Sequence, residues 1–309
     1  MKLAWSLFAI LSTMQSCADV NPDMLDRSAV SDAGEPLLAA LVATRSTLVD
    51  GIESAENLLF TSDGRLLVTG SDAIYEVHRS GADHFEATVV LSGADGCIFT
   101  GIAEIAAVIY ATCSDYASST LFAARLTDVS DIRQVAVLSD VLLANGLASD
   151  SDGRLYIAEM IQGQIERLTF SSSDPFAIAS RQLWLAGTGL FTDGLKVFRS
   201  AVYWTDFGSI KTATIRPRGE PGLIRTLTNE LTFFDDLFVS DRRIFVADFL
   251  GGAIRSFDLS GFPRTTAVSG ELVNPSAVAP AAGRLGLGAD DWVVTEKGAN
   301  RVALITVSR

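Results

Sequence analysis

Four residues with oxygen-bearing side chains recur at the same place in a repeated sequence motif. They are Glu56, Asn145, Asp193 and Asp235, and each stands at the start of an apolar run. Carboxylate and amide oxygens are the ligands that hard cations prefer. If these side chains converge, the three carboxylates repel one another unless a cation neutralises them or some are protonated. The set therefore predicts a divalent-cation site, with Ca²⁺ as the first expectation and Mn²⁺ or Zn²⁺ as alternatives.

The motif that carries these residues reads as a β-hairpin. In its clearest copy, Asn145 to Glu159, an apolar strand is followed by Asp152-Gly153, a dipeptide typical of tight turns, and by a second apolar strand. Copies begin at residues 56, 100, 145, 193, 235 and 275, so the period is 40 to 48 residues. A period of this size without helical periodicity is typical of a β-propeller. We predict an all-β fold, a six-bladed β-propeller with four-stranded antiparallel blades.

The propeller would bring the repeated positions together, because the innermost strand of each blade lines the centre of the ring. The residues at this place are Glu56, Thr100, Asn145, Asp193, Asp235 and the pair Pro275-Ser276. An alternative is that Asn145-Gly146 and Asp193-Gly194 are turn formers that only shape the loops into their blades. The common register of four oxygen-bearing residues across separate repeats favours the site.

Composition indicates a single acidic domain. The 309 residues are 48% hydrophobic and 20% charged, with a formal net charge of −13. These values exclude general disorder and argue against nucleic acid or an anionic membrane surface as a partner, since both need clustered Lys and Arg. A propeller accommodates this length as one unit. We expect a flexible polar tether over residues 18–35 and a monomeric propeller over residues 36–309.

The N-terminus is typical of an export signal. The apolar run from Leu3 to Leu11 follows a lysine and is too short to span a bilayer. Met14 to Cys17 resembles the lipobox of bacterial lipoproteins, which predicts a signal over residues 1–17 and a lipid anchor on Cys17. Ordinary cleavage after Ala18 is the alternative. In either case the mature chain would be exported to the periplasm, and any membrane contact would be through the lipid anchor.

Two further cysteines, Cys97 and Cys113, flank one hairpin. An oxidising compartment favours a disulfide between them. With a turn near Ala106, Cys97 would face a residue near 115 or 116, so the register is slightly displaced. The alternative is a pair of buried free thiols.

The ends of the ring must also be joined. Thr47 to Val49 is predicted to be a strand that completes the last blade beside Arg301 to Val307. This pairing would close the propeller.

The chain resembles the senescence marker protein/gluconolactonase family of six-bladed propellers, with paraoxonases and strictosidine-synthase-like proteins as more distant relatives. The resemblance covers Ile52 to the C-terminus and depends on AEN at Ala55 to Asn57, NGL at Asn145 to Leu147, DGL at Asp193 to Leu195 and DDL at Asp235 to Leu237. Members of this family bind one divalent cation through a Glu in the first blade, Asn residues in the third and fourth, and an Asp in the fifth. Asp193 departs from the pattern, since the family usually has Asn there.

The resemblance implies hydrolysis of a small-molecule lactone or ester. Asp235 would be the general base and a metal ligand, Glu56 and Asp193 would hold the cation, and Asn145 would ligate and orient. Asp236 would contact the metal-binding residues without binding the cation itself. The main alternative is a non-catalytic propeller that binds a protein or glycan partner. A quinone-dependent or paraoxonase-like site is disfavoured, because the two histidines, His78 and His84, are predicted to lie away from the mouth.

Overall fold

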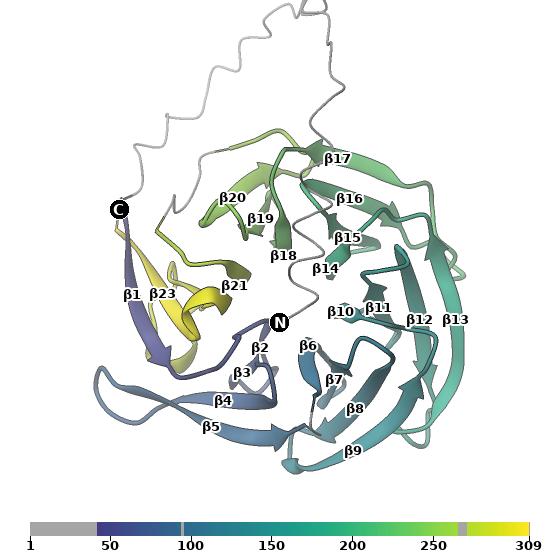
Figure 1. The fold of residues 1–309 in the computed structure, drawn as a ribbon, viewed down its shortest axis with the longest axis horizontal. Helices are drawn as coiled ribbons and strands as arrows, with labels where there is room; N and C mark the ends of the chain where they lie inside the picture. Colours follow the sequence, from purple (N-terminus) through teal and green to yellow (C-terminus); the bar gives the residue numbers. More distant parts are fainter. Residues whose placement is uncertain (1–41, 94–95, 265–270, 309) are drawn as a thin grey trace, which may run out of the picture. The chain divides into compact units, whose positions relative to one another are not determined.

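The computed structural model describes residues 42–93, 96–264 and 271–308, which form six antiparallel sheets arranged as the blades of a ring (Figure 1). The expected signal, Cys17 and the tether lie outside the described residues. The innermost strands lie nearest the centre of the ring and the last strands lie at its rim. The six-bladed propeller predicted from the repeats is confirmed.

The strands follow the chain blade by blade. Blade 1 contains β2 (Leu58–Phe60), β3 (Leu66–Thr69), β4 (Ala73–Arg79) and β5 (Phe85–Ser92), and blade 2 contains β6 (Ile98–Ile105), β7 (Val108–Ser114), β8 (Ser119–Arg125) and β9 (Asp128–Leu138). Blade 3 contains β10 (Ala144–Ser149), β11 (Leu155–Glu159), β12 (Gln164–Phe170) and β13 (Ile178–Ala186), and blade 4 contains β14 (Thr192–Phe198), β15 (Ala201–Asp206), β16 (Ser209–Thr214) and β17 (Arg225–Asn229). Blade 5 has three described strands, β18 (Phe234–Val239), β19 (Arg243–Asp248) and β20 (Ala253–Asp258).

Blade 6 joins the two ends of the described chain. It contains β21 (Pro275–Pro280), β22 (Trp292–Glu296) and β23 (Arg301–Ser308), and its outer strand is β1 (Val42–Asp50). In the pairing of β1 with β23, Thr47 lies opposite Ala303. The predicted closure is therefore confirmed, with a longer strand than expected. Two short 3₁₀ helices, η1 (Arg284–Gly286) and η2 (Lys297–Ala299), interrupt this blade.

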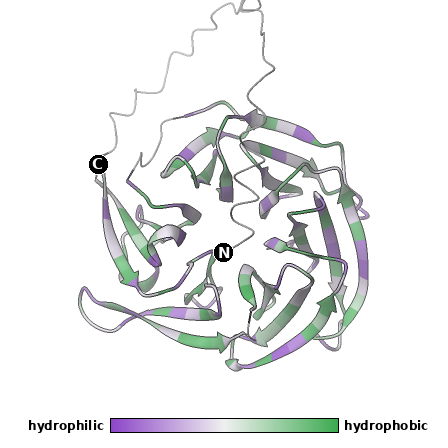
Figure 2. Cartoon of the chain, viewed as in Figure 1, coloured by the Kyte–Doolittle hydropathy of each residue, from purple (hydrophilic) through white to green (hydrophobic). Residues whose placement is uncertain are grey.

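Hydrophobic packing between neighbouring blades holds the ring together. One buried cluster joins blade 2 to blade 3 through residues such as Tyr110 and Leu155, and another joins blade 3 to blade 4 through Tyr156 and Trp204. In Figure 2 apolar residues run through the strands, whereas hydrophilic residues mark the inner ends of several innermost strands. Polar side chains are therefore concentrated where the blades meet at the centre.

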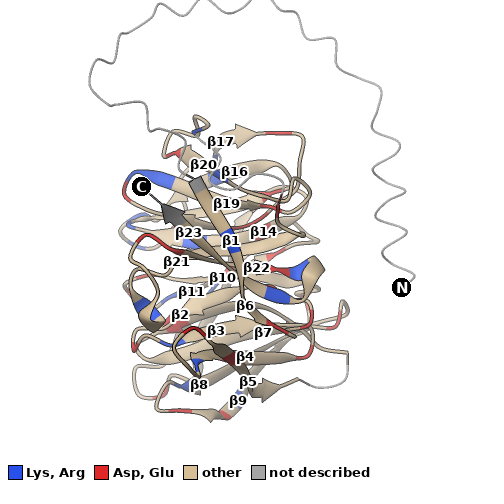
Figure 3. Cartoon of the chain, turned by 90° about the vertical axis from the view of Figure 1, so that its left-hand side faces the viewer, with Lys and Arg blue, Asp and Glu red and all other residues tan. Residues whose placement is uncertain are grey.

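Charged residues of both signs alternate on the side of the ring shown in Figure 3, and this side has no continuous basic stripe. Within the described ranges, no helix is both long and apolar enough to cross a membrane.

The innermost strand of each blade begins with an irregularity that defines six mouth residues. In blades 2 to 6 the pairing with the second strand shifts at a β-bulge. In blade 1 the N–H of Glu56 donates to the Thr69 carbonyl and the Thr69 N–H donates to the Asn57 carbonyl, so two residues again face one. The first bulge residues are Glu56, Thr100, Asn145, Asp193, Asp235 and Ser276, which we call the mouth residues. A bulge bends its strand and re-aims a side chain.

The interpretation of Asn145-Gly146 and Asp193-Gly194 as turn formers is wrong. Both pairs lie inside strands, and neither glycine has a positive φ. A Cβ on Gly146 would lie 2.3 Å from the carbonyl oxygen of Asp193, and a Cβ on Gly194 would lie 2.3 Å from Cα of Asp236. These glycines let adjacent blades approach closely at the centre. Gly153, by contrast, has φ 76° and forms the predicted turn.

A disulfide joins Cys97 to Cys113, whose Cα atoms are 5.6 Å apart. The hairpin turns at Ala106 and Ala107, both with positive φ, and pairs Phe99 with Cys113. Cys97 therefore lies just before the paired strand, displaced in register as expected. The bridge spans the start of β6 and the end of β7, so it ties the mouth end of blade 2.

Candidate functional site

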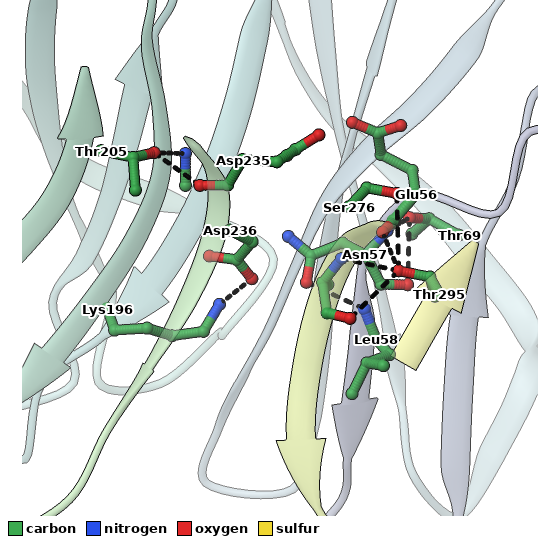
Figure 4. A network of polar contacts seen from close by, with 12 residues as sticks. Glu56, Asn57, Leu58, Thr69, Lys196, Thr205, Asp235, Asp236, Ser276 and Thr295 are labelled. Atoms are coloured by element: carbon green, nitrogen blue, oxygen red, sulfur yellow. Dashed lines mark hydrogen bonds and ion pairs between the residues drawn. The ribbon is translucent and has the colours of Figure 1, made fainter. Parts of the chain in front are cut away.

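Threonine hydroxyls stabilise the bulges that carry the mouth residues. The hydroxyl of Thr205 accepts the N–H of Gly194 at 2.9 Å and donates to the carbonyl oxygen of Asp235 in the next blade at 2.6 Å. Thr295 repeats this arrangement, since it accepts from its own bulge at 2.7 Å and donates to the Glu56 carbonyl at 2.7 Å. Each such threonine fixes two adjacent blades at once. Figure 4 shows both threonines behind the two mouth residues that they hold.

Two of the six mouth residues have structural roles. The Thr100 hydroxyl donates to the Ala144 carbonyl, and the Ser276 hydroxyl donates to the Ala55 carbonyl at 2.9 Å. Their side chains therefore link blades. The other four are the residues predicted to form the site, and all four are buried, at 2% to 7% exposure.

Three of these four act on one another. Repulsion from Glu56 contributes to raising the pKa of Asp193, and repulsion from Asp193 and Glu56 contributes to raising that of Asp235. In Figure 4 the carboxylates of Glu56 and Asp235 point toward each other from different blades. Glu56, Asp193 and Asp235 are therefore near enough for their charges to interact. Asn145 occupies the equivalent bulge, and within the described residues no hydrogen bond ties its side chain elsewhere.

Lysine 297 lies among these carboxylates and was not anticipated from the sequence. It begins η2, directly after β22, and its ammonium group forms an ion pair with the Glu56 carboxylate. Although burial lowers its pKa, the negative charges of Glu56 and Asp235 raise it overall. Lys297 is therefore charged and acts as an internal counter-ion.

A sequence signal for Lys297 did exist. In blades 3, 4 and 5 the acidic residue that ends the second strand is followed by an apolar residue, namely Met160, Phe207 and Phe249. In blade 6 the corresponding acidic residue is followed by Lys297. The N–H groups of Met160, Phe249 and Lys297 each donate to the residue two places before the mouth residue of the same blade, at 2.9 to 3.1 Å. The position is thus structurally equivalent in these blades.

Burial is the largest cause of the raised pKa values of Asp193 and Asp235, and both rise well above the usual range of aspartate. The Lys297 charge opposes this rise, whereas nearby Asp236 adds to it. Asp236 is itself buried and forms an ion pair with Lys196. Four carboxylates thus face two ammonium groups, which leaves a formal excess of two negative charges.

The donor chemistry of the cluster fits a divalent cation. Among the described residues, Oδ1 of Asp193 and Oδ1 of Asp236 are buried without a hydrogen-bond partner. Anionic oxygens left without partners are costly to bury and are suited to a hard cation. In the described part of the chain, no three His, Cys, Asp or Glu side chains are close enough together to hold a metal ion. A cation would therefore need these side chains to draw together, and it would compete with Lys297 for Glu56.

The acids at the ends of the second strands have a different role. Glu159 accepts the N–H of Leu143, and Glu296 accepts the N–H of Val273 at 2.8 Å, so each holds the loop that leads into its blade. Glu296 is also paired with Arg45 and Arg301, which ties β1 to the closing blade. His78 and His84 lie on β4 and in the turn after it, and the His84 side chain is 72% exposed. Both histidines are away from the mouth, as predicted.

Comparison with known proteins identifies the fold but no family. No family model matches the sequence, and no curated protein matches it either. Membership of the senescence marker protein/gluconolactonase family therefore stays a resemblance.

Solved structures with the same architecture have different activities. An auxiliary nutrient binding protein from Bacteroides thetaiotaomicron is similar over 90% of this chain and 79% of that chain, with a TM-score of 0.69 and 10% identity. A luciferin-regenerating enzyme covers 86% and 97%, with a TM-score of 0.62 and 11% identity. The PQQ-bound aldose sugar dehydrogenase from Streptomyces coelicolor covers 87% and 99%, with a TM-score of 0.59 and 15% identity. Similarity at this level shows the fold alone, and it includes both enzymes and binding proteins.

Proposed function

We propose that the mouth of this propeller is a hydrolase site for lactones or related carboxylic esters, which works with one divalent cation. The observation that carries the proposal is the buried cluster of Glu56, Asp193, Asp235 and Asp236, with its excess of negative charge and its unpartnered oxygens. Perturbed carboxylates gathered in one buried place are typical of functional sites. The chain would act outside the cytoplasm, where the Cys97–Cys113 disulfide is stable.

Asp235 has the properties of a general base. A base is most effective when its pKa lies near the working pH, and burial together with the charges of Asp193 and Glu56 raises the pKa of Asp235 toward that range. Its backbone is fixed by Thr205, so the carboxylate is held in place to accept a proton from an attacking water. Asn145 would orient the substrate through its amide.

Glu56, Asp193, Asp235 and Asn145 would hold the cation, and Ca²⁺ is expected first because all the donors are oxygens. When bound, the cation would polarise the carbonyl oxygen of the substrate as a Lewis acid. Lys297 would either move away from Glu56 or share the Glu56 carboxylate with the cation.

The test is a panel of aldonolactones, alkyl lactones and simple aryl esters assayed with Ca²⁺, Mn²⁺ and Zn²⁺. We expect turnover with at least one metal, and a loss of about 10²- to 10⁴-fold in Asp235→Asn if this residue is the base. Absence of turnover with every metal would remove the hydrolase proposal. It would favour the alternative, a binding propeller, for which the similarity to nutrient binding proteins from Bacteroides is the supporting observation.

A further inference from the structure

Four phenylalanines form a cluster beside the carboxylates. They are Phe191, Phe207, Phe233 and Phe249, and the ring centroids of neighbouring members lie 5.9 to 6.4 Å apart. Three of the four contacts have the edge-to-face arrangement that aromatic pairs prefer, and the contact between Phe191 and Phe207 is tilted. All four side chains remain partly exposed. The cluster therefore presents apolar surface to solvent.

The cluster is on the same edge of the ring as the mouth. In an antiparallel blade, the start of the first strand, the end of the second and the start of the third lie at one edge. Phe191 and Phe233 stand two residues before the mouth residues Asp193 and Asp235, and Phe207 and Phe249 directly follow the ends of β15 and β19. Each phenylalanine is thus next to the site.

Exposed leucines extend this surface. Leu190 is 68% exposed, Leu250 is 61% exposed and Leu231 is 99% exposed. Leu190 and Leu250 directly neighbour Phe191 and Phe249 in the sequence, and Leu231 lies two residues before Phe233. Together with the four phenylalanines they make up what we call the apolar sector. Contiguous exposed apolar surface on a folded domain marks a binding site.

The backbone adds a second, independent observation. Phe191 has φ 67° and Phe207 has φ 53°, a conformation that bulky side chains rarely adopt. The N–H of Phe191 donates to the Met160 carbonyl, and the N–H of Phe234 donates to the Phe207 carbonyl, so neighbouring blades fix both residues.

The mouth is therefore asymmetric. Blades 4 and 5 place phenylalanines two residues before the mouth residue and directly after the second strand. Blade 6 places Asn274 and Lys297 at these positions, and the bond from the Lys297 N–H to the Asn274 carbonyl matches the bond from the Phe249 N–H to the Phe233 carbonyl in blade 5. The mouth is thus apolar over blades 4 and 5 and polar and charged over the neighbouring blade 6, where the Asn274 amide donates to the Phe249 carbonyl at 3.1 Å. A ligand that satisfies both sides carries an apolar group at one end and a polar carbonyl group at the other.

We propose that the apolar sector binds the substituent of the substrate, so that the site takes lactones or esters with an alkyl or aryl group rather than polyhydroxylated sugar lactones. This inference rests on the proposed hydrolase function for its reaction. The carbonyl group lies toward Asp235 and Glu56, and the substituent lies over Phe191 and Phe233. Burial of each methylene on the cluster favours binding by about fourfold.

The test compares γ-lactones that differ only in the length of the alkyl chain, with glucono-1,5-lactone as the polar counterpart. We expect kcat/KM to rise by roughly 16- to 250-fold from no side chain to a four-carbon side chain of which about two to four carbons are buried. In Phe233→Ala this dependence on chain length should flatten. Phe262→Ala is the matched control, since Phe262 is 56% exposed but lies on the turn after β20, at the other edge of the ring. It should keep the wild-type dependence.

A binding measurement separates this inference from the hydrolase proposal. The fluorescent apolar amine N-phenyl-1-naphthylamine is titrated into the full-length protein, and a long-chain γ-lactone is used to displace it. Binding that is weakened at least fivefold in Phe233→Ala and unchanged in Phe262→Ala supports the apolar sector even if no lactone is turned over. Equal binding by all three proteins overturns it, and so does hydrolysis of glucono-1,5-lactone at least as fast as that of the alkyl lactones. A dimer that Phe233→Ala dissociates, without binding of the amine, would assign the surface to a second copy of the chain instead.

Discussion

Replacement of Lys297 by methionine should strengthen the binding of Ca²⁺. In the wild-type protein the Lys297 ammonium group is paired with Glu56 and lies close to Asp193 and Asp235, so it repels any other cation there. A unit charge and a divalent ion about 6 Å apart repel by about 1.4 to 3 kcal/mol when the effective dielectric constant is between about 80 and 40. Lys297→Met removes this repulsion, and the dissociation constant should fall by about 10- to 100-fold.

The same substitution should destabilise the protein without calcium. Glu56 would be left buried and unpaired, which typically costs about 3–5 kcal/mol. Calcium should then restore the melting temperature of the variant. Two effects of opposite sign, a lower Tm without metal and a larger increase in Tm with metal, are expected from one replacement.

Isothermal titration calorimetry and thermal unfolding with and without Ca²⁺ measure both effects at fixed pH and ionic strength. Lys211→Met is the matched control, because Lys211 forms a similarly buried pair with Asp206, outside the mouth. It should lose stability without any rescue by calcium. A Lys297→Met protein that binds Ca²⁺ no more tightly than the wild type would refute the view that Lys297 occupies the cation position.

Three further predictions concern the mouth and the blades. Asp193 has a raised pKa in the folded state, so its protonation favours folding. Without metal, Asp193→Asn should therefore have a higher melting temperature than the wild type at neutral pH. This difference in melting temperature should shrink as the pH falls toward about 4 and the wild-type aspartate becomes protonated. Differential scanning fluorimetry over this range measures it, and a constant difference would contradict the assignment. Cys97 and Cys113 should resist alkylation before reduction, and two labelled thiols in the native protein would exclude the bridge. Replacement of both cysteines by serine should lower the free energy of unfolding by about 3 kcal/mol in urea titrations. Thr205→Val should cost about 2–3 kcal/mol, because it leaves a buried N–H and a buried carbonyl without their shared partner. A loss below about 0.5 kcal/mol would mean that the blades do not depend on this bridge.

The ring and its mouth residues could be predicted because each depends on local sequence that is repeated. Asp152-Gly153 specifies a hairpin turn, and every copy of the hairpin places one residue at the same bulge. Glu56, Asp193 and Asp235 can therefore be located from the spacing of the repeats alone. The final strand pairing could be predicted because a closed ring needs it.

Other features could not be predicted, because they depend on contacts between blades. The small residues after Asn145 and Asp193 look like turn formers, and only the neighbouring backbone shows why glycine is needed. Lys297 is missed because the sequence does not show that the residue after the second strand of blade 6 contacts the mouth residue of the neighbouring blade 1. The phenylalanine cluster is assembled from four loops of two blades. Phe191 and Phe207 are 16 residues apart, as are Phe233 and Phe249, but the spacing does not show that the rings of the two blades meet.

Ring closure by β1 and β23 determines when the site can exist during synthesis. Glu56 belongs to the first blade and Lys297 to the sixth, so a growing chain has Glu56 without Lys297 until the sixth blade has been made. Contacts between such distant segments form late, since a long loop must be closed before they become favourable. A chain without the sixth blade therefore has all four carboxylates but lacks both the strand pairing that closes the ring and the ammonium group that is paired with Glu56.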